Sequence, residues 1–328
     1  MSRKVTIIMY HFVRDLKHSR YPGIKGLTIN QFKEQVSYIR KYYTPIKMDD
    51  LIRNVESDDV HLPPNPVLLT FDDGYVDHFT NVFPILDEER MEGSFFPPAK
   101  AIVENRVLDV NKIHFILASV QDKSRIVDFI HTMLDELKGE YPIQSKEYYS
   151  TKVPTTSRFD GKEVTFIKAM LQRELPEGAR KIIIDRLFTR HVTEDEKAFS
   201  SELYMSVDQI MCMRRNGMYI GSHGYDHYWL NTLTREKQER EIDLSMEFLG
   251  RLGCKPDNWV MCYPYGAYND SLLSLLKDKG CRLGLSVNVG IADLEIENPL
   301  TLSRLDTNDL PKQRDAEPNE WTLQSINR

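Results

Sequence analysis

Two adjacent carboxylates close a short apolar stretch of the chain. Residues 67–71 read Val-Leu-Leu-Thr-Phe, and Asp72, Asp73 and Gly74 follow directly. An apolar run of this length that stops at polar residues predicts a buried parallel strand with carboxylates at its C-terminal end. Because two neighbouring carboxylates repel each other, a bound cation is the simplest way to compensate them.

Two histidines stand four residues apart after a second short apolar stretch. They are His223 and His227, in the sequence Tyr-Ile-Gly-Ser-His-Gly-Tyr-Asp-His. One carboxylate and two imidazoles, with a coordination position left open, form the ligand set of a catalytic divalent metal. Asp-Asp-Gly alone is more often a turn, and His-x-x-x-His alone is more often structural or incidental. Complementary ligands at two predicted strand ends therefore carry more weight together than either motif does alone.

A third motif, Tyr-Pro-Tyr-Gly at residues 263–266, completes an ordered set. With Thr-Phe-Asp-Asp-Gly and His-x-x-x-His before it, the chain resembles the polysaccharide deacetylase family, metal-dependent carbohydrate esterases that share the NodB-type domain. The resemblance covers roughly residues 3–100 and 205–310. It implies an α/β fold, a distorted (β/α)7-type barrel with parallel strands.

The resemblance also implies a role for each residue of the motifs. Asp72 would be the general base, and Asp73 would hold a divalent metal ion, with Zn²⁺ as the expected identity. His223 and His227 would be the other two protein ligands. The backbone N–H of Tyr265 would help the metal to hold the tetrahedral oxyanion. A divalent ion lowers the pKa of bound water toward ~7, and a nearby carboxylate can then complete the deprotonation.

Some positions depart from the pattern of the family. Many relatives have Arg where Cys262 stands, paired with the base aspartate. Arg304, on a predicted late strand, either supplies this charge or forms a surface salt bridge. Relatives usually have Ser or Thr directly after the first histidine, where this chain has Gly224. The nearby Asp226 either orients an imidazole or faces solvent.

The general acid of the family is also missing from its usual place. Many relatives use a histidine near the C-terminus, but no histidine follows His227 here. His11 ends the predicted first strand, so we expect it at the same end of the barrel as the carboxylates and take it as the substitute. Its alternative role is a plain hydrogen bond to a loop. His114 is the runner-up, and it could act only if the segment around it folded over the site.

Strand-like and helix-like apolar patterns alternate over most of the chain, as in a parallel α/β fold. We predict a deacetylase-like barrel from residues 1–106 and 201–310, interrupted by a mainly helical insertion at 107–200. The insertion is either extra packing on the barrel or a lid or dimer element that shapes the substrate cleft. Residues 311–328 read as a polar C-terminal tail.

Composition excludes several classes of protein. The 328 residues carry a net charge of −6 and no dense basic run, so a nucleic-acid partner is not expected. The four cysteines show no Cys-x-x-Cys spacing and are expected to be reduced thiols. The first apolar run is too short for a signal peptide, and no run reaches the roughly 18 residues of a membrane span. We therefore expect a cytoplasmic protein.

Together these features predict a metal-dependent hydrolase that removes an N-acyl group, expected to be acetyl, from an amino sugar in surface-polysaccharide biosynthesis. The amino sugar could be nucleotide-linked, lipid-linked or part of an oligosaccharide, and a homo-oligomer is possible. One alternative is a deformylase or cyclic-amide hydrolase on the same fold. Another is a non-catalytic carbohydrate-binding protein, which an Asp72→Asn variant would reveal because a binder would keep its function.

Overall fold

The computed structural model describes residues 3–57, 59–153, 158 and 160–326. The chain forms two compact units. Unit 1 contains Met1–Asp15, Gly26–Asn105 and Ser201–Arg328, and unit 2 contains Leu16–Lys25 and Arg106–Ser200. The short segment 16–25, which we expected within the barrel, thus groups with the helical segment.

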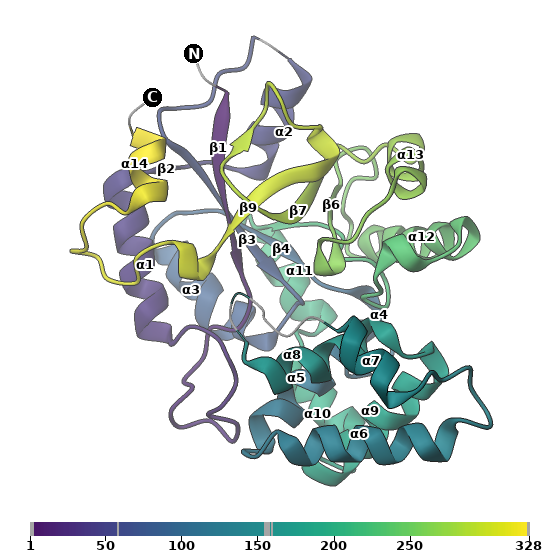
Figure 1. The fold of residues 1–328 in the computed structure, drawn as a ribbon. Helices are drawn as coiled ribbons and strands as arrows, with labels where there is room; N and C mark the ends of the chain where they lie inside the picture. The colour runs from purple at the N-terminus through teal and green to yellow at the C-terminus, as the bar shows by residue number, and fades with distance from the viewer. Residues whose placement is uncertain (1–2, 58, 154–157, 159, 327–328) are drawn as a thin grey trace. The chain divides into compact units, whose positions relative to one another are not determined.

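Within the described residues, seven strands of unit 1 form one curled path of parallel neighbours (Figure 1). Their order is β5-β4-β3-β1-β9-β7-β6. The strands are β1 (Lys4–Tyr10), β3 (Pro66–Asp72), β4 (Gly93–Phe96), β5 (Tyr219–Ile220), β6 (Val260–Cys262), β7 (Leu283–Val289) and β9 (Leu302–Asp306). Just beyond β5, Ser222 pairs with Met261 of β6, and this bridge joins the two ends of the path. The predicted distorted barrel of parallel strands is confirmed.

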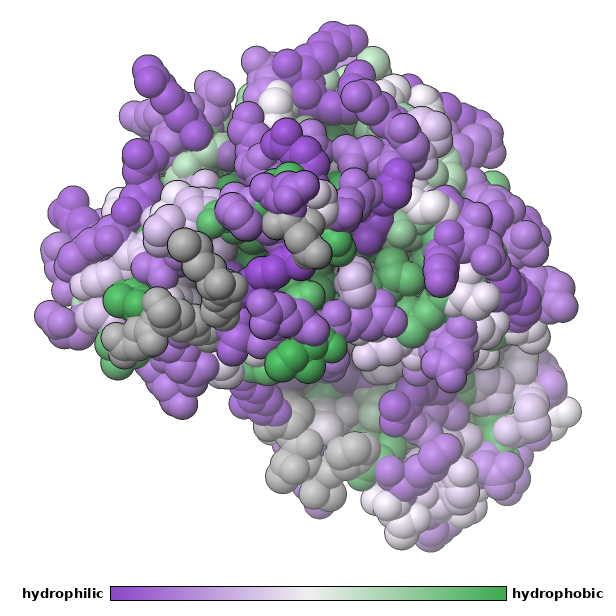
Figure 2. All heavy atoms as spheres, turned by 90° about the horizontal axis from the view of Figure 1, so that it is seen from above, coloured by the Kyte–Doolittle hydropathy of each residue, from purple (hydrophilic) through white to green (hydrophobic). Residues whose placement is uncertain are grey.

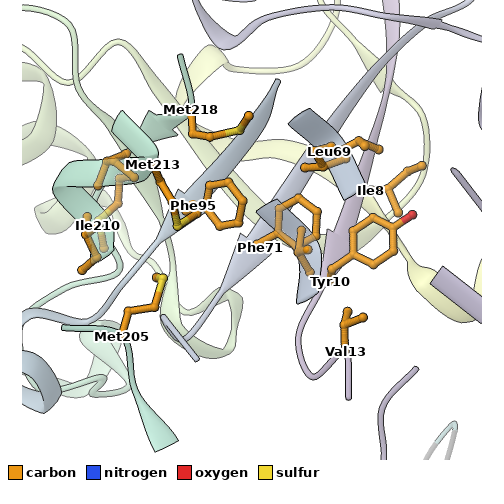
Figure 3. Close-up of a cluster of buried hydrophobic side chains, with 14 of the residues drawn as sticks. Ile8, Tyr10, Val13, Leu69, Phe71, Phe95, Met205, Ile210, Met213 and Met218 are labelled. Carbon is orange, nitrogen blue, oxygen red and sulfur yellow. The ribbon is translucent and has the colours of Figure 1, made fainter. Parts of the chain in front are cut away.

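Strand β3 is buried along its whole length. It is a nearly continuous apolar run because strands of a parallel sheet are covered on both faces. Its register places Phe71 opposite Tyr10 of β1, and Asp72 opposite Phe96 of β4. The ring of Phe71 stacks on Tyr10 and on Phe95, with centroids 5.0 and 4.7 Å apart, in the apolar cluster of Figure 3. This packing anchors the residue that directly precedes Asp72.

Two further strands of two residues each extend the sheet. β2 (Thr44–Pro45) pairs with β3, and β8 (Ala292–Asp293) pairs antiparallel with β1.

Helices of unit 1 follow the strands, and Figure 1 shows α12 and α13 beside β6. Thr28 caps the first helix in a reciprocal capping box with Gln31. The helices are α1 (Ile29–Tyr42), α2 (Met48–Glu56), α3 (Phe83–Glu88), α4 (Ala99–Val103), α11 (Val207–Arg215), α12 (Arg235–Arg251), α13 (Asp270–Asp278) and α14 (Glu320–Ile326). The π-helical turn η1 (His78–Val82) leads into α3, and the 3-10 turn η4 (Pro264–Gly266) follows β6.

Unit 2 is helical throughout its described elements. They are α5 (Asp109–Ser119), α6 (Ser124–Leu137), α7 (Lys146–Lys152), α8 (Lys162–Ala169), η2 (Met170–Glu174), α9 (Glu177–His191) and α10 (Glu196–Leu203), which continues into unit 1. Segment 16–25 joins this unit through Tyr21, whose ring lies 5.0 Å from Phe115 and 5.9 Å from Phe199. Aromatic contacts therefore hold the segment to the helices.

The C-terminal segment, which we expected to be a polar tail, contains helix α14. Thr322 of this helix is buried, and its hydroxyl lies 2.8 Å from Tyr38 Oη and 3.0 Å from Tyr43 Oη. Ser325 is also buried and bonds to Thr6 of β1 at 3.0 Å. Polar contacts thus dock the segment onto unit 1, and such contacts leave no apolar periodicity in the sequence.

Hydrophilic side chains cover most of the face shown in Figure 2, and hydrophobic residues show in small separate areas. Among the helices that the structure describes, none has the length and apolar character needed to cross a membrane.

Candidate active site and metal centre

Polar residues gather at the C-terminal ends of the barrel strands. Asp72 is the last residue of β3, and Asp73 follows it. His11 follows β1, and Cys262 ends β6. Because all neighbouring strands of the path are parallel, these ends meet at one end of the barrel, where active sites of such folds are found.

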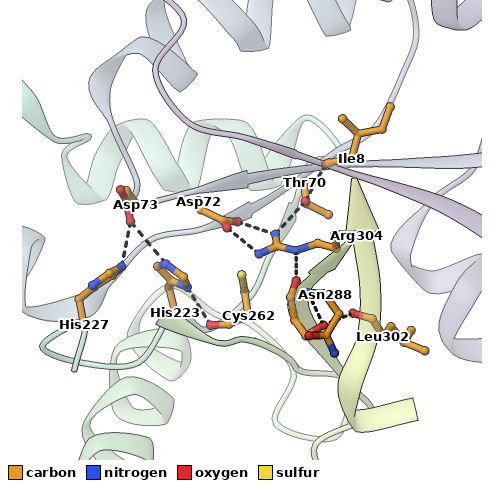
Figure 4. Close-up of polar contacts among 11 residues, drawn as sticks. Ile8, Thr70, Asp72, Asp73, His223, His227, Cys262, Asn288, Leu302 and Arg304 are labelled. Carbon is orange, nitrogen blue, oxygen red and sulfur yellow. Dashed lines mark hydrogen bonds and ion pairs between the residues drawn. The ribbon is translucent and has the colours of Figure 1, made fainter. Parts of the chain in front are cut away.

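Asp73, His223 and His227 point toward one another (Figure 4). Asp73 Oδ1 lies 3.4 Å from His223 Nε2 and 3.3 Å from His227 Nε2, and all three side chains are buried. Ligand atoms bound at ~2.0–2.1 Å to a tetrahedral ion are roughly 3.3–3.4 Å apart. The separations therefore fit a zinc-like ion, and a fourth position is left to water or substrate.

Neighbouring groups prepare these donor atoms. His223 Nδ1 donates to the carbonyl oxygen of Cys262 at 2.7 Å, so Nε2 is the nitrogen that faces Asp73. Burial opposes protonation of His223, but its neighbours Cys262, Asp73 and Asp72 raise its pKa well above the usual range, so a metal ion would have to displace the Nε2 proton. Tyr75 donates its hydroxyl hydrogen to Asp73 Oδ2, which leaves Oδ1 for the histidine side. Burial opposes ionisation of Asp73, but hydrogen bonds from His223 and His227 outweigh it and hold the pKa well below its usual range. Burial lowers the pKa of His227, which favours the neutral imidazole that a metal requires.

Arg304 reaches Asp72 from β9. Its Nη1 and Nη2 donate to Asp72 Oδ1 and Oδ2 at 3.0 and 2.9 Å, a two-pronged contact between two buried side chains. Nη1 also bonds to Thr70 Oγ1 at 3.1 Å, and Nε to the carbonyl of Ser286 at 2.7 Å. Burial alone would raise the pKa of Asp72, yet Arg304 and the nearby histidines lower it to about 2. Asp72 is thus an ionised carboxylate beside the histidine ligand set, and Arg304 is a buried partner of it.

Cys262 lies in the same cluster without offering a better metal ligand. A second set of donor atoms, Asp72, His223 and Cys262, also lies within 4.8 Å of one another. However, burial raises the pKa of the Cys262 thiol, and Asp72 is already engaged by Arg304. Since a thiol must deprotonate to bind zinc, the set around Asp73 fits an ion better.

A family model described as polysaccharide deacetylase matches residues 59–129 and 187–284, just over half of the chain. The chain belongs to the polysaccharide deacetylase family. The matched stretches of the chain contain Asp72, Asp73 and both histidines of the site, whereas His11 and Arg304 lie outside them.

Individual deacetylases resemble the chain more weakly. It is 27% identical over 96 residues to YxkH of Bacillus subtilis (strain 168), which bears the name of a polysaccharide deacetylase. The match covers 29% of this chain and 34% of YxkH, so the chain spans about a third of the length of this curated relative. The structure of the Streptococcus pyogenes deacetylase PplD in complex with acetate has a TM-score of 0.59 and 17% identity, over 99% of each chain. IcaB from Ammonifex degensii has a TM-score of 0.55 and 16% identity, over 98% of this chain and 95% of that one. At these identities the structural likeness concerns the fold.

The remaining predicted residues of this deacetylase-family site also lie in unit 1. His11 directly follows β1, at the end of the barrel where Asp72 and Asp73 follow β3, and a positive charge on its ring would lower the pKa of both carboxylates. Its carbonyl oxygen lies 3.0 Å from His78 Nε2. Burial lowers the pKa of His78 to about 4, so the ring is neutral and donates through Nε2.

Tyr265 belongs to the turn η4 beside the ligands. Its ring centroid lies 4.7 Å from that of His227 and 4.5 Å from that of Trp229, on which it stacks. The sequence pattern pointed to Tyr265 but not to Trp229, although Trp229 stands only two residues after a predicted ligand. Contacts between aromatic rings therefore hold the turn η4 against the segment that contains His227 and Trp229.

Asp226 does not orient an imidazole. Its carboxylate pairs with Lys100 of α4, and the carbonyl of Cys262 takes the place at His223 that Asp226 could have filled. His114, the second candidate for the acid, belongs to unit 2, whereas the other predicted site residues belong to unit 1.

The backbone is strained at three residues of the site. Asp73, His227 and Tyr265 have φ values of 72°, 56° and 57°, in the left-handed region. Such a conformation costs a non-glycine residue on the order of 1 kcal/mol. Among the described residues, three other non-glycine residues share it, and they are Asn65, Arg90 and Asn105.

Proposed function

We propose that the protein is a metal-dependent hydrolase that removes an N-acetyl group from an amino sugar. The observation that carries this proposal is the triangle of Asp73, His223 and His227, with separations that fit a zinc-like ion, next to the ionised Asp72. Membership of the polysaccharide deacetylase family supports the same reaction.

In this proposal Asp73, His223 and His227 hold the ion. A divalent ion bound there would supply Lewis-acid activation of water and of the substrate carbonyl. Cys262 and Tyr75 contribute indirectly, since they fix the donor atoms of His223 and Asp73. The donor set of two imidazoles and one carboxylate favours zinc among the common divalent ions.

The chain's own residues move the protons. Asp72 accepts a proton from the attacking water, and Arg304 keeps the carboxylate ionised and fixed. The backbone N–H of Tyr265 donates to the carbonyl oxygen as it gains negative charge. His11 acts as the acid that protonates the departing nitrogen when the C–N bond breaks. The products are a free amine and a carboxylate.

The substrate is assigned by class. Two similar structures support acetyl as the group removed. PplD was solved in complex with acetate, and a protein from Aggregatibacter actinomycetemcomitans is named a de-N-acetylase. We propose an N-acetylated amino sugar in a polymer or in a nucleotide- or lipid-linked precursor, used in building a surface polysaccharide.

The test is acid release from N-acetylglucosamine oligomers by zinc-loaded protein. We expect acetate and free amine in equal amounts. Asp72→Asn should keep zinc but lower kcat by about 10²–10⁴-fold, the usual contribution of a general base. Asp73→Ala should lose both zinc and activity. Asp208→Asn, at an exposed carboxylate of α11, is the matched control and should behave as the wild type.

Other outcomes would redirect the assignment. Release of formate from formylated sugars, without acetate, would point to a deformylase on the same fold. Sugar binding that is unchanged in Asp72→Asn, with no acid released by the wild type, would identify a carbohydrate-binding protein instead.

A further inference from the structure

The loop that carries both histidine ligands is held by helix α12. Glu241 of this helix is buried, with 6% of its surface exposed. A single oxygen, Glu241 Oε2, accepts the backbone N–H of Tyr225 at 3.1 Å and of Asp226 at 2.9 Å. Both amides lie between His223 and His227. Burial raises the pKa of Glu241 to about 7, and the carbonyl oxygen of a neutral carboxyl group still accepts such hydrogen bonds.

Other residues on the same face of α12 extend this contact. Ser245, one turn after Glu241, lies 2.7 Å from Ser222 through their hydroxyl oxygens. Ser222 Oγ in turn accepts the N–H of Gly224 at 3.2 Å. Gln238, one turn before Glu241, donates to the carbonyl of Leu230 at 2.9 Å. A helix face turned to the interior is usually apolar. Three buried polar residues on this face of α12 therefore indicate that it is adapted to hydrogen-bond the segment around the two histidines.

Helix α4 holds the carbonyl groups of the same loop. The N–H groups of Ala99 and Lys100 donate to the carbonyls of Gly224 and Tyr225 at 3.3 and 2.9 Å. The ammonium of Lys100 also pairs with the carboxylate of Asp226. The loop needs such support because His227 adopts a φ value of 56°, which is unfavourable for a residue other than glycine.

We propose that Glu241 is a positioning residue for the metal centre. Its hydrogen bonds to Tyr225 and Asp226 go to backbone N–H groups, and they fix the backbone that aims His223 and His227 at Asp73. A metal site must hold its donors to within about 0.5 Å, and the two hydrogen bonds of Glu241 help to meet this demand because they hold the loop between His223 and His227. The proposal rests on the proposed metal site, and it assigns Glu241 a role that no sequence motif indicates.

The test compares zinc affinity, measured by competition with a chelating indicator, in Glu241→Ala, Glu241→Gln and Glu247→Ala. Glu247 is an exposed residue of the same helix. We expect Glu241→Ala to bind zinc about 10–100-fold more weakly, the usual cost of losing support around a metal site. Glu241→Gln keeps an acceptor oxygen and should restore most of the affinity, and Glu247→Ala should match the wild type.

Amide hydrogen exchange of the metal-free wild type is the second measurement, and it stands even if Glu241→Ala folds poorly. The Tyr225 and Asp226 amides should be as protected as those of α12. Fast exchange of these amides, or equal zinc affinity in Glu241→Ala and Glu247→Ala, would overturn the role of Glu241 and leave the deacetylase proposal intact. Absence of zinc binding by the wild type would instead overturn the metal site itself.

Discussion

Asp72 and Arg304 are two buried charges, and each depends on the other. The guanidinium is fully buried and the carboxylate nearly so, with exposed side-chain fractions of 0% and 3%. Removing one partner of such a pair leaves the other charge without compensation in the interior. The pair therefore links the stability of the barrel to the position of the proposed base.

Replacing Arg304 tests this dependence. We expect Arg304→Met to lower the free energy of unfolding at pH 7 by about 3–5 kcal/mol. Urea denaturation of the metal-free protein measures it. Arg282→Met removes an ion pair to Glu56 in which both side chains are about two-fifths exposed, and it should cost less than about 1 kcal/mol. Similar losses in the two variants would contradict a special role for the buried pair.

The sequence could predict which side chains meet in space where these residues belong to short motifs at strand ends. Asp73, His223 and His227 stand at strand ends whose apolar runs are easy to read, and the structure brings them together. Arg304 was undecided because its strand is distant in sequence from that of Asp72, and only the order β3-β1-β9 makes them neighbours. Glu241 could not be found, since its partners are backbone N–H groups that carry no residue identity.

At the scale of elements, buried and partly buried carboxylates tie neighbouring helices, strands and loops together through backbone N–H groups. Glu92 stands directly before β4, and its Oε1 accepts the N–H of Met48, the first residue of α2, at 2.9 Å. Burial raises the pKa of Glu92 to about 7, with Asp49 and Asp50 adding repulsion. A group whose pKa is raised by folding contributes stability at low pH that is lost as pH rises through the folded pKa.

Glu92→Gln should therefore change the pH profile of stability. As the pH rises from about 4.5 to 7, the wild type should lose the stability that Glu92 contributes at low pH. The variant has no ionisable group at this position and should not show this loss. The variant should gain on the order of 1–3 kcal/mol relative to the wild type from pH 4 to pH 8. Urea denaturation across this range measures the difference. The exposed Glu88→Gln is the control, and a wild-type-to-variant difference that does not vary with pH would refute the prediction.

The main strands and helices could be predicted because apolar period and turn residues agree along most of the chain. Strand β3 extends only one residue beyond each end of the predicted strand at 67–71. The two-residue strands β2 and β8 were not expected, since two residues show no period. Helix α14 was read as a tail because buried Thr322 and Ser325 dock it through hydroxyl groups.

At the scale of the whole molecule, we expect the stability of the fold to depend on a metal ion bound by Asp73, His223 and His227. All three donors belong to unit 1, and the unfolded chain has no preformed site. Ligand binding to the folded state alone adds about 2.7 kcal/mol at 100 times the dissociation constant. We expect zinc to raise the Tm of the metal-free protein by several degrees, as measured by calorimetry. His223→Ala should abolish the increase, and the exposed His61→Ala should keep it. An equal zinc response in both variants would place the ion elsewhere.

The left-handed backbone at Asp73, His227 and Tyr265 has a consequence for protein engineering. Selection for stability alone would favour glycine or asparagine at these positions, because both relieve the strain. A procedure that stabilises the fold by such replacements would remove two of the proposed metal ligands and the aromatic ring of Tyr265 in the same three steps. Conversely, a cluster of non-glycine residues with positive φ at one end of a barrel marks the candidate site from the backbone alone, before any side chain is considered.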